Sequence, residues 1–486
     1  MNKLYLFKNN IKLILMLVLF SCSSVGFAQM SGSYTIDNTQ ATAGTNYQTW
    51  AAFRSAIVGA GVNGPVTVTV MTDNTESTVD FGAITGASAT NTITINGNNK
   101  VLSVNSSDAV IILSGADYMT FNQLIVRNTS TATSLRGFRI HNNSDYNTIK
   151  NSTIEFTSLS TSSTSGGAYI AFSSSTTSST TMSSTNPGAY NTIINNLMRT
   201  TNVNSPGPTY ALTVLGSNSS YTFLAQNNTV RNNTIQNFHR CAIYMYYTNG
   251  NQIVGNDISR ANATSNNAST TLYGIDCEYS YATSRATRLD SNNLHDWPFL
   301  GATPASSPTT VYAFYTFYNY GNATNRFAMN SNTIKNVMAF QNNYLGYNYN
   351  NFYNDLINNF ADNNDVTVST SSLYNFHGWL NQYNQNEYRF NRNTIQNCDG
   401  GYYFYGIRNE YPSSACTVAQ INGNTIKNNT NSYFYHYSIR SNWTYNSALY
   451  PVEINDNIIE GNTNTYYYHY SIYAYYYGNY LSLIHI

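Results

Sequence analysis

A three-residue signature that recurs about every 32 positions constrains the fold of this chain more than any other feature. Its copies are Tyr210-Ala211-Leu212, Cys241-Ala242-Ile243, Tyr273-Gly274-Ile275, Tyr312-Ala313-Phe314, Tyr374-Asn375-Phe376, Tyr405-Gly406-Ile407, Tyr437-Ser438-Ile439 and Tyr470-Ser471-Ile472. Successive copies lie 31, 32, 39, 62, 31, 32 and 33 residues apart, so the gap of 62 holds two periods, with Tyr344 as a degenerate copy. A fixed period of this length is typical of a stacked repeat, in which each unit buries its apolar face against its neighbours.

A second signature, Asn-Thr-Ile-x-Asn, accompanies the first. It is cleanest at 332–336, 393–397 and 424–428, and looser copies begin at Asn147, Asn191, Asn233, Asn256 and Asn457. Each period therefore holds a strand around Asn-Thr-Ile, a strand around the first signature, and an approach strand such as Val452-Glu453-Ile454. Three short strands with no helical segment between them predict one coil of an all-β parallel β-helix with a period of about 31–33 residues.

The apolar third residue of the first signature sets the expected orientation of its neighbours. Because side chains alternate along a strand, residues at even offsets from it, the signature Tyr included, are predicted to point into the core. The recurring Asn residues are predicted to stand at tight turns. There their amides can hydrogen-bond up and down the stack, and Asn tolerates left-handed backbone.

The Asn-Thr-Ile-x-Asn copies and the opening segment around Trp50 and Phe53 resemble the right-handed parallel β-helix proteins of the pectate-lyase-like superfamily. Segments 31–36 and 62–68 are similar to those of large secreted bacterial β-helix proteins, many of which end in a type IX secretion sorting domain. The resemblance covers nearly all of the mature chain. It implies a fold and the outer surface or surroundings of a Gram-negative bacterium, and it does not imply a particular activity.

The N-terminus reads as a signal peptide over residues 1–28. Lys3, Lys8 and Lys12 precede an apolar core at 13–20 that is too short to span a bilayer, and small residues end at Ala28. The alternative is a lipobox at 19–22, which would leave a lipidated Cys22.

The mature chain is predicted to divide into a cap and a repeat array. Residues 29–82 form a small α/β cap, with an amphipathic helix over 46–59 whose apolar face carries Trp50, Phe53 and Ile57. Residues 83–480 form the β-helix, from which the Ser/Thr-rich run 158–184 protrudes as a loop. Residues 481–486 break the Tyr- and Asn-rich texture, and we interpret them as translated sequencing adapter, with the native C-terminus missing.

Composition excludes several classes of partner. Charged residues make up 9% of the chain and the formal net charge is zero, with no Lys/Arg cluster for nucleic-acid phosphates. No segment after the signal is apolar enough for a membrane helix, and we expect a monomer without a cofactor. Cys241 and Cys277 are both predicted to face inward but about 13 Å apart along the strand direction, too far for a disulfide. The pairing of Cys398 and Cys416 stays open.

The sequence contains few candidate catalytic residues. Asp276 and Glu278 lie together on the predicted outer face, about 7 Å apart along a strand, which falls within the carboxylate spacing of inverting glycosidases. A solvated surface pair is the competing interpretation. His295-Asp296 is either half of an acid–base couple or an ordinary turn. His436 and His469 lack the carboxylate or Cys support of a metal site, so none is predicted.

The outer face of the late repeats is the better binding candidate. The predicted register aligns three columns, which are Tyr402 with Phe434 and Tyr467, Phe404 with His436 and His469, and Arg408 with Arg440 and Tyr473. Aromatic faces flanked by Arg and His can stack on sugar rings and hydrogen-bond to hydroxyl or acidic groups. The alternative is that cross-strand aromatic pairs only stabilise the sheet.

The sequence therefore favours a secreted or cell-surface β-helix protein that is structural or adhesive, non-catalytic and able to bind glycans through Phe404, Arg408, Phe434, His436, Arg440, Tyr467, His469 and Tyr473. The alternative is an extracellular polysaccharide lyase or glycoside hydrolase. Its site would lie in the insertions between Tyr273 and Tyr312.

Overall fold

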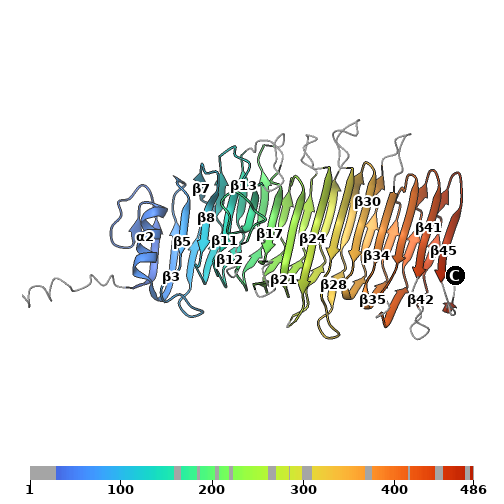
Figure 1. Ribbon diagram of the computed structural model, residues 1–486. Helices are drawn as coiled ribbons and strands as arrows, with labels where there is room; N and C mark the ends of the chain where they lie inside the picture. Colours follow the sequence, from blue (N-terminus) through green and yellow to red (C-terminus); the bar gives the residue numbers. More distant parts are fainter. Residues whose placement is uncertain are drawn as a thin grey trace, which may run out of the picture.

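The computed structural model describes residues 29–157, 166–182, 187–202, 207–217, 223–260, 270–283, 285–297, 309–366, 375–413, 416–443, 452–476 and 482–484. Over these residues the chain forms an elongated right-handed parallel β-helix whose coils stack along one axis (Figure 1). The predicted signal peptide and the alternative lipobox at 19–22 lie outside the described residues.

Three parallel sheets line the body, and successive strands enter them in turn. The first sheet has 16 strands, and the second and third have 14 each. One coil consists of β35 (Gln385–Asn391) in the first sheet, β36 (Thr394–Gln396) in the second and β37 (Tyr403–Glu410) in the third. The predicted fold class, with three short strands per period, is confirmed.

The third sheet carries the signature strands. They are β5 (Val79–Gly82), β8 (Ala109–Ser114), β11 (Arg136–His141), β14 (Ala168–Phe172), β17 (Tyr210–Leu215), β21 (Cys241–Asn249), β24 (Thr271–Tyr281), β27 (Thr310–Phe317), β30 (Asn342–Tyr349), β34 (Asn375–Gln382), β37, β41 (Tyr435–Trp443) and β45 (His469–Tyr476).

The N-terminal end of the body is covered by helix α2 (Trp50–Ala60), as the sequence predicts, although the helix begins four residues later than expected. Thr49 caps it by accepting a hydrogen bond from the Ala52 amide, and the Glu76 carboxylate accepts from the Trp50 amide at 2.6 Å. Trp50, Phe53 and Ile57 are fully buried. The predicted cap segment also supplies β3 (Val62–Val70), β4 (Asn74–Glu76) and β5, one strand for each sheet.

Asn ladders hold the turns, as predicted. In the ladder before the second sheet, the backbone amide of each Asn donates to the side-chain oxygen of the next, as from Asn332 to Asn359 (3.0 Å) and from Asn359 to Asn393 (3.0 Å). The residue before each of these Asn residues has a positive φ, as at Asn358 (59°). The copies at Asn147 and Asn191 form a separate ladder before the first sheet, so the second signature marks two corners.

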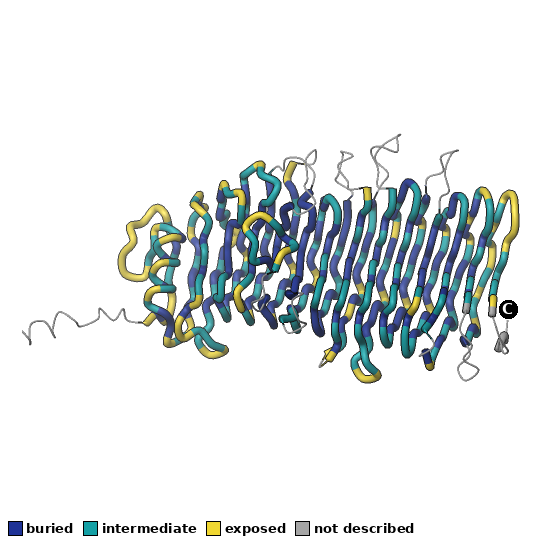
Figure 2. Tube along the Cα trace, in the orientation of Figure 1, coloured by how far each residue is buried: buried dark blue, intermediate teal, exposed yellow. Residues whose placement is uncertain are grey.

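The core is a continuous apolar column through all coils, with exposed residues gathered at turns and at the cap (Figure 2). Strand pairing skips the small residue of the first signature, since Tyr273 pairs with Tyr312 and Ile275 with Phe314. A Cβ at Gly406 would meet Ile426 from the facing strand at 3.0 Å, so this position points inward as well. Two consecutive residues therefore face the core, and alternation breaks there.

This break overturns the predicted orientation of the signature Tyr. Because the small residue and the Ile both point inward, the Tyr two positions before the Ile lies on the outer face. The prediction that these tyrosines point into the core is wrong, although neighbouring rings still cover Tyr210 and Tyr405, which are 6% and 7% exposed. Cys241 stands in the same column, paired with Tyr210 and Tyr273, so its predicted inward orientation is wrong too.

One further signature copy is shifted, and the predicted loop at 158–184 changes as well. His377-Gly378-Trp379, and not Tyr374-Asn375-Phe376, pairs with the neighbouring signatures, because His377 pairs with Tyr344 and Tyr405. Tyr344 is confirmed as the degenerate copy. Gly346 leaves the room that the Trp379 ring fills. The run 158–184 is a protruding loop only in part, since it contains the buried strand β14.

The four described cysteines are buried, unpaired thiols. Among the described residues, none of the helices combines the length and the apolar character needed to cross a membrane.

Candidate functional site

The outer face of the third sheet, from β24 to β45, is an aromatic surface, called here the aromatic face. Its centre is a continuous stack of the signature rings, called the tyrosine stack. The ring centroids of Tyr273–Tyr312, Tyr312–Tyr344, Tyr344–His377, His377–Tyr405, Tyr405–Tyr437 and Tyr437–Tyr470 are 5.2, 4.8, 4.5, 4.9, 5.3 and 5.0 Å apart. These separations match the spacing of neighbouring strands, so the fold itself imposes the stack.

A second column of rings runs beside the stack, one residue after the signature apolar residue. Tyr315 and Tyr347 stack at 5.3 Å with an interplanar angle of 4°, and Tyr315 meets Tyr312 edge to face. Phe317 and Tyr349 extend the surface to a third column. The aromatic face is therefore two to three rings wide.

Of the residues predicted to bind glycans, Arg408, Arg440 and Tyr473 do form an outer column of this face. Phe434 stacks between Tyr402 and Tyr467, with ring centroids 4.7 Å and 4.6 Å away. The three rings lie in the successive turns that precede β37, β41 and β45.

Phe404 and His436 do not lie on the outer face. Both are fully buried, with ring centroids 4.4 Å apart, because the break in alternation turns their column inward. His469 pairs with His436 in this inward column and is exposed in its own coil. Burial lowers the pKa of His436 to about 3, so it is a neutral core residue at neutral pH.

Two guanidinium groups share one carboxylate in the late coils. Arg408 lies 2.7 Å from Glu410 and Arg440 3.9 Å from the same oxygen, while only 4% of the Glu410 side chain is exposed. The Arg408 guanidinium lies 4.6 Å from the centre of the Tyr405 ring, and Arg440 lies 5.4 Å from that of Tyr437. The cluster carries a net positive charge beside stacked rings.

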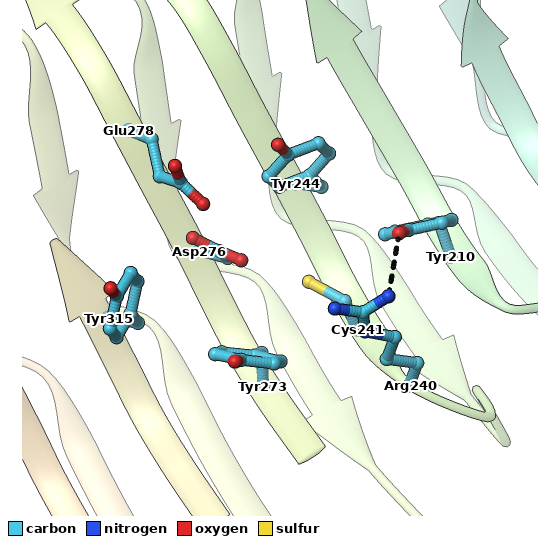
Figure 3. A pocket seen from close by; sticks show the side chains of 8 residues that line it. All are labelled: Tyr210, Arg240, Cys241, Tyr244, Tyr273, Asp276, Glu278 and Tyr315. Atoms are coloured by element: carbon cyan, nitrogen blue, oxygen red, sulfur yellow. Dashed lines mark hydrogen bonds between the residues drawn. The ribbon is translucent and has the colours of Figure 1, made fainter. Parts of the chain in front are cut away.

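A small cavity of about 110 Å³ opens at the N-terminal end of the aromatic face. We call it the carboxyl cavity. It lies over β17, β21, β24 and β27, where Tyr210, Tyr244, Tyr273 and Tyr315 surround the carboxyl groups of Asp276 and Glu278 (Figure 3). Arg240 and Cys241 complete the lining, with Nη1 of Arg240 3.5 Å from the Tyr210 hydroxyl.

Burial acts on the proton affinity of both carboxyl groups. Burial, followed by the charge of Glu278, raises the pKa of Asp276 well above its usual value. Burial also raises the pKa of Glu278, although the hydrogen bond with Asp276 and the charge of Arg240 offset part of the rise. Asp276, the more deeply buried of the two, therefore holds a proton more strongly than Glu278 does. Burial likewise raises the pKa of Tyr210 and of Tyr273 to about 12, which keeps both phenols neutral.

This geometry changes both interpretations of the pair. Asp276 and Glu278 do lie together on the outer face, but Asp276 is only 7% exposed, so they are not a solvated surface pair. Both carboxyl groups line one cavity together with Arg240 and four tyrosines, so any acid–base role of the pair would belong to this cavity.

His295 lies on the second sheet, away from these groups. Its Nε2 is 2.9 Å from Asp257 and its Nδ1 is 2.9 Å from Asp296. Both ring nitrogens are occupied, which leaves neither for acid–base work on a substrate. The interpretation of His295-Asp296 as an ordinary turn is wrong, because both residues lie within β26 (Asn293–Trp297), where the left-handed backbone of Asp296 (φ 52°) bends the strand.

An open groove of about 420 Å³ lies at the corner after the third sheet, and sequence reasoning missed it. This corner groove is lined by Tyr318, Tyr349, Asn350, Tyr383, Gln385, Tyr411 and Ser413. Tyr383 and Tyr411 stack at 5.6 Å and both have left-handed backbone. The available signal was a Tyr four residues after the signature apolar residue, as at Tyr279, Tyr318 and Tyr411.

Comparisons with known proteins add the fold alone. No family model and no curated sequence matches the chain. A GH136 lacto-N-biosidase from Eubacterium ramulus is 10% identical over 90% of this chain and 68% of its own, with a TM-score of 0.41. Pectate lyase Pel9A is 13% identical over 83% and 76%, with a TM-score of 0.29. PfbA, a surface adhesin of Streptococcus pneumoniae, is 9% identical over 87% and 87%, with a TM-score of 0.35.

Proposed function

We propose that this protein is a secreted or cell-surface glycan-binding protein, structural or adhesive in role, that holds a polysaccharide along the aromatic face. The observation that carries the proposal is the corner groove, where the 42% exposed Tyr383 stacks on Tyr411 beside the amides of Asn350 and Gln385. Its volume of about 420 Å³ suits one or two sugar units. Rings supply the apolar faces of a sugar site, and amides supply donors and acceptors for hydroxyl groups.

The aromatic face supports a polymer rather than a single sugar. It continues from the groove through Tyr349 into the tyrosine stack. A ligand along it would meet a ring about every 4.8 Å, the strand spacing. The Arg408–Arg440 cluster would add hydrogen bonds to hydroxyl or acidic groups. A monomer presenting this surface outside the cell, after removal of residues 1–28 or with a lipid on Cys22, would suffice for adhesion.

The groove is tested with Tyr383→Asn combined with Tyr411→Asn. Asn tolerates the left-handed backbone at both positions, and Asn350 already occupies the equivalent position in a neighbouring coil. After a glycan array has identified a ligand, the double variant should bind it roughly thirtyfold more weakly, from about 1 kcal/mol per ring.

The matched control is Tyr146→Asn, at another corner. Tyr146 is 44% exposed against 42% for Tyr383, and it also stacks on a neighbour and has a positive φ. This variant should bind as the wild type does. Unchanged affinity in the double variant would remove the groove from the site. A Tyr467→Ala, Tyr473→Ala variant asks separately whether the last coil contributes.

Polysaccharide cleavage is the second candidate, favoured by one observation, the buried Asp276 beside Glu278 in a tyrosine-lined cavity. Such a pair can act as acid and base. Reducing-end and unsaturated-uronate assays on the array ligands test it. Turnover that disappears in Asp276→Asn or Glu278→Gln, with folding intact, would establish an enzyme and overturn the non-catalytic proposal.

A further inference from the structure

The carboxyl cavity contains a buried acceptor without a donor. Oδ1 of Asp276 has no hydrogen-bond partner among the described residues, although the side chain is more than nine-tenths buried. An unsatisfied buried polar atom destabilises the protein unless a guest satisfies it. None of the phenol or guanidinium groups that line the cavity donates to Oδ1, so the missing group is a hydrogen-bond donor supplied from outside.

The lining restricts the chemistry of that donor. Glu278 places a second carboxyl group in the same cavity, which disfavours an anionic guest. Four tyrosine rings surround the pair (Figure 3), and the negative face of an aromatic ring attracts cations. Arg240 supplies one positive charge, which balances one carboxylate but not two. A cavity of about 110 Å³ is smaller than the roughly 150 Å³ that holds a benzene ring, so it takes a substituent of a sugar ring.

We propose that the carboxyl cavity binds the protonated amino group of an amino sugar whose ring lies on the aromatic face. An ammonium group brings three donors, enough for Oδ1 of Asp276 and for Glu278. Tyr273 and Tyr315 belong both to the cavity and to the columns of the aromatic face, so a glycan lying there can insert a substituent. The inference rests on the proposed function for the placement of the sugar ring.

Charge balance gives this site a distinctive signature. When the carboxyl pair holds one proton, the charge of Arg240 balances the remaining carboxylate and the cavity is neutral. When an ammonium group enters, the second carboxyl group can ionise and release its proton to solvent, which keeps the cavity neutral. Tyr210, Tyr244, Tyr246, Tyr273, Tyr315 and Cys241, the other titratable groups around the pair, all have pKa values raised by burial and stay protonated.

The test compares D-glucosamine, N-acetylglucosamine and glucose by titration calorimetry in two buffers of different ionisation enthalpy. D-glucosamine should bind at least about tenfold tighter than the other two, since hydrogen bonds to charged groups are worth more than neutral ones. It should release about one proton. Its affinity should rise by up to about tenfold per pH unit while the probe remains protonated, because protons compete for Asp276. Equal affinities, or binding without proton release, would overturn the inference.

Variants assign the effect to the pair. Asp276→Asn should fold, since an amide is close in shape to the protonated acid. It should abolish both proton release and the preference for the amine. Glu278→Gln should weaken amine binding by about tenfold or more. Asp257→Asn, which removes a half-exposed carboxylate from the second sheet, should leave both unchanged.

The inference and the proposed function fail separately. Oligosaccharides that bind without any preference for an amine would leave the proposed function standing and remove the inference. Glucosamine binding with proton release, but no binding of any oligomer, would do the reverse. The Tyr383→Asn, Tyr411→Asn variant should lose oligomer binding and keep glucosamine binding.

Discussion

The early and late coils of the third sheet share an interior and differ on the outside. Ile111 and Phe138 in the early coils and Ile275 and Ile407 in the late coils are all fully buried at the same signature position. On the outer face, the early coils carry an ion network in which Asp108 accepts from Arg136 at 2.8 Å and from Arg139 at 3.0 Å. The late coils carry the aromatic face instead.

This difference shows that the repeat and the surface follow separate constraints. The period is set by residues that must stack in the core at the strand spacing, so it persists through all coils. The outer columns are under no such packing requirement. In the early coils, charged side chains and the segment 173–182 cover the outer face. In the late coils this face carries aromatic rings, two arginines and the opening of the carboxyl cavity.

The largest expected effect belongs to the early coils. Arg136 is completely buried, and its guanidinium also bonds to Ser179 and to the Thr176 carbonyl. Arg136→Ala should lower the free energy of unfolding by about 3–5 kcal/mol, because it leaves the half-buried Asp108 with one partner fewer. Denaturant titration measures the loss. Glycan binding per folded molecule should not change, and a parallel loss of binding would break the division between the two halves.

In the late coils, substitutions should weaken glycan binding more than they lower stability. Arg408→Ala combined with Arg440→Ala should weaken binding of an acidic oligosaccharide by roughly tenfold to a hundredfold, as charge-assisted hydrogen bonds are lost. Neutral oligosaccharides should lose much less. Because Glu410 would be left buried without a cation, Glu410→Gln is added to separate binding from stability. If the affinity for neutral and for acidic ligands falls equally, the arginines act by stabilising the sheet and not by contacting the ligand.

A pH-dependent effect is expected from His436. Burial lowers its pKa to about 3, whereas an unfolded His titrates near 6.5. As pH falls below about 6.5, this group binds a proton in the unfolded state but not in the folded state. Its contribution therefore lowers the free energy of unfolding by about 1.4 kcal/mol per pH unit. His436→Phe, which places in this coil the ring that Phe404 has in its neighbour, should remove that loss. Urea midpoints at pH 7 and pH 5 measure it.

The contribution of His295 to stability should depend on pH in the opposite direction to that of His436, and it should be the smallest of these effects. Burial lowers its pKa, but hydrogen bonds and charge from Asp296 and Asp257 raise it by more, above the usual value. Its contribution is therefore complete below about pH 6.5 and is lost as pH rises through the raised pKa. The pair partners are nearly half exposed, so His295→Gln should cost under about 1 kcal/mol. A larger cost at pH 8 than at pH 6 would contradict this assignment.

The fold was predictable because it depends on what recurs. The signature Ile must stack, the Asn must bridge turns, and the helix around Trp50 and Phe53 must cover the first coil. Each requirement left a periodic trace in the sequence. The Arg408–Arg440–Tyr473 column followed from the same register, since these residues lie after the irregularity in the strand.

The site was predictable only in part, because one irregularity in the strand reverses the orientation of the side chains that precede the small residue. Strict alternation turned the signature Tyr inward and Phe404 and His436 outward, and the structure reverses the orientation in each case. Nothing in the Tyr-small-Ile pattern distinguishes a regular strand from one in which two successive residues face inward. The corner tyrosines were missed because their left-handed backbone places them on a turn that the strand pattern does not describe.

The sequence by itself determined a stacked parallel coil, its period, its Asn ladders and its capped start, since local pattern and nearest-neighbour burial suffice for these. Only the tertiary structure decided which rings face outward and that Asp276 and Glu278 line one cavity with four tyrosines. Both depend on how a strand irregularity orients side chains against neighbouring coils, and on how much water those neighbours exclude.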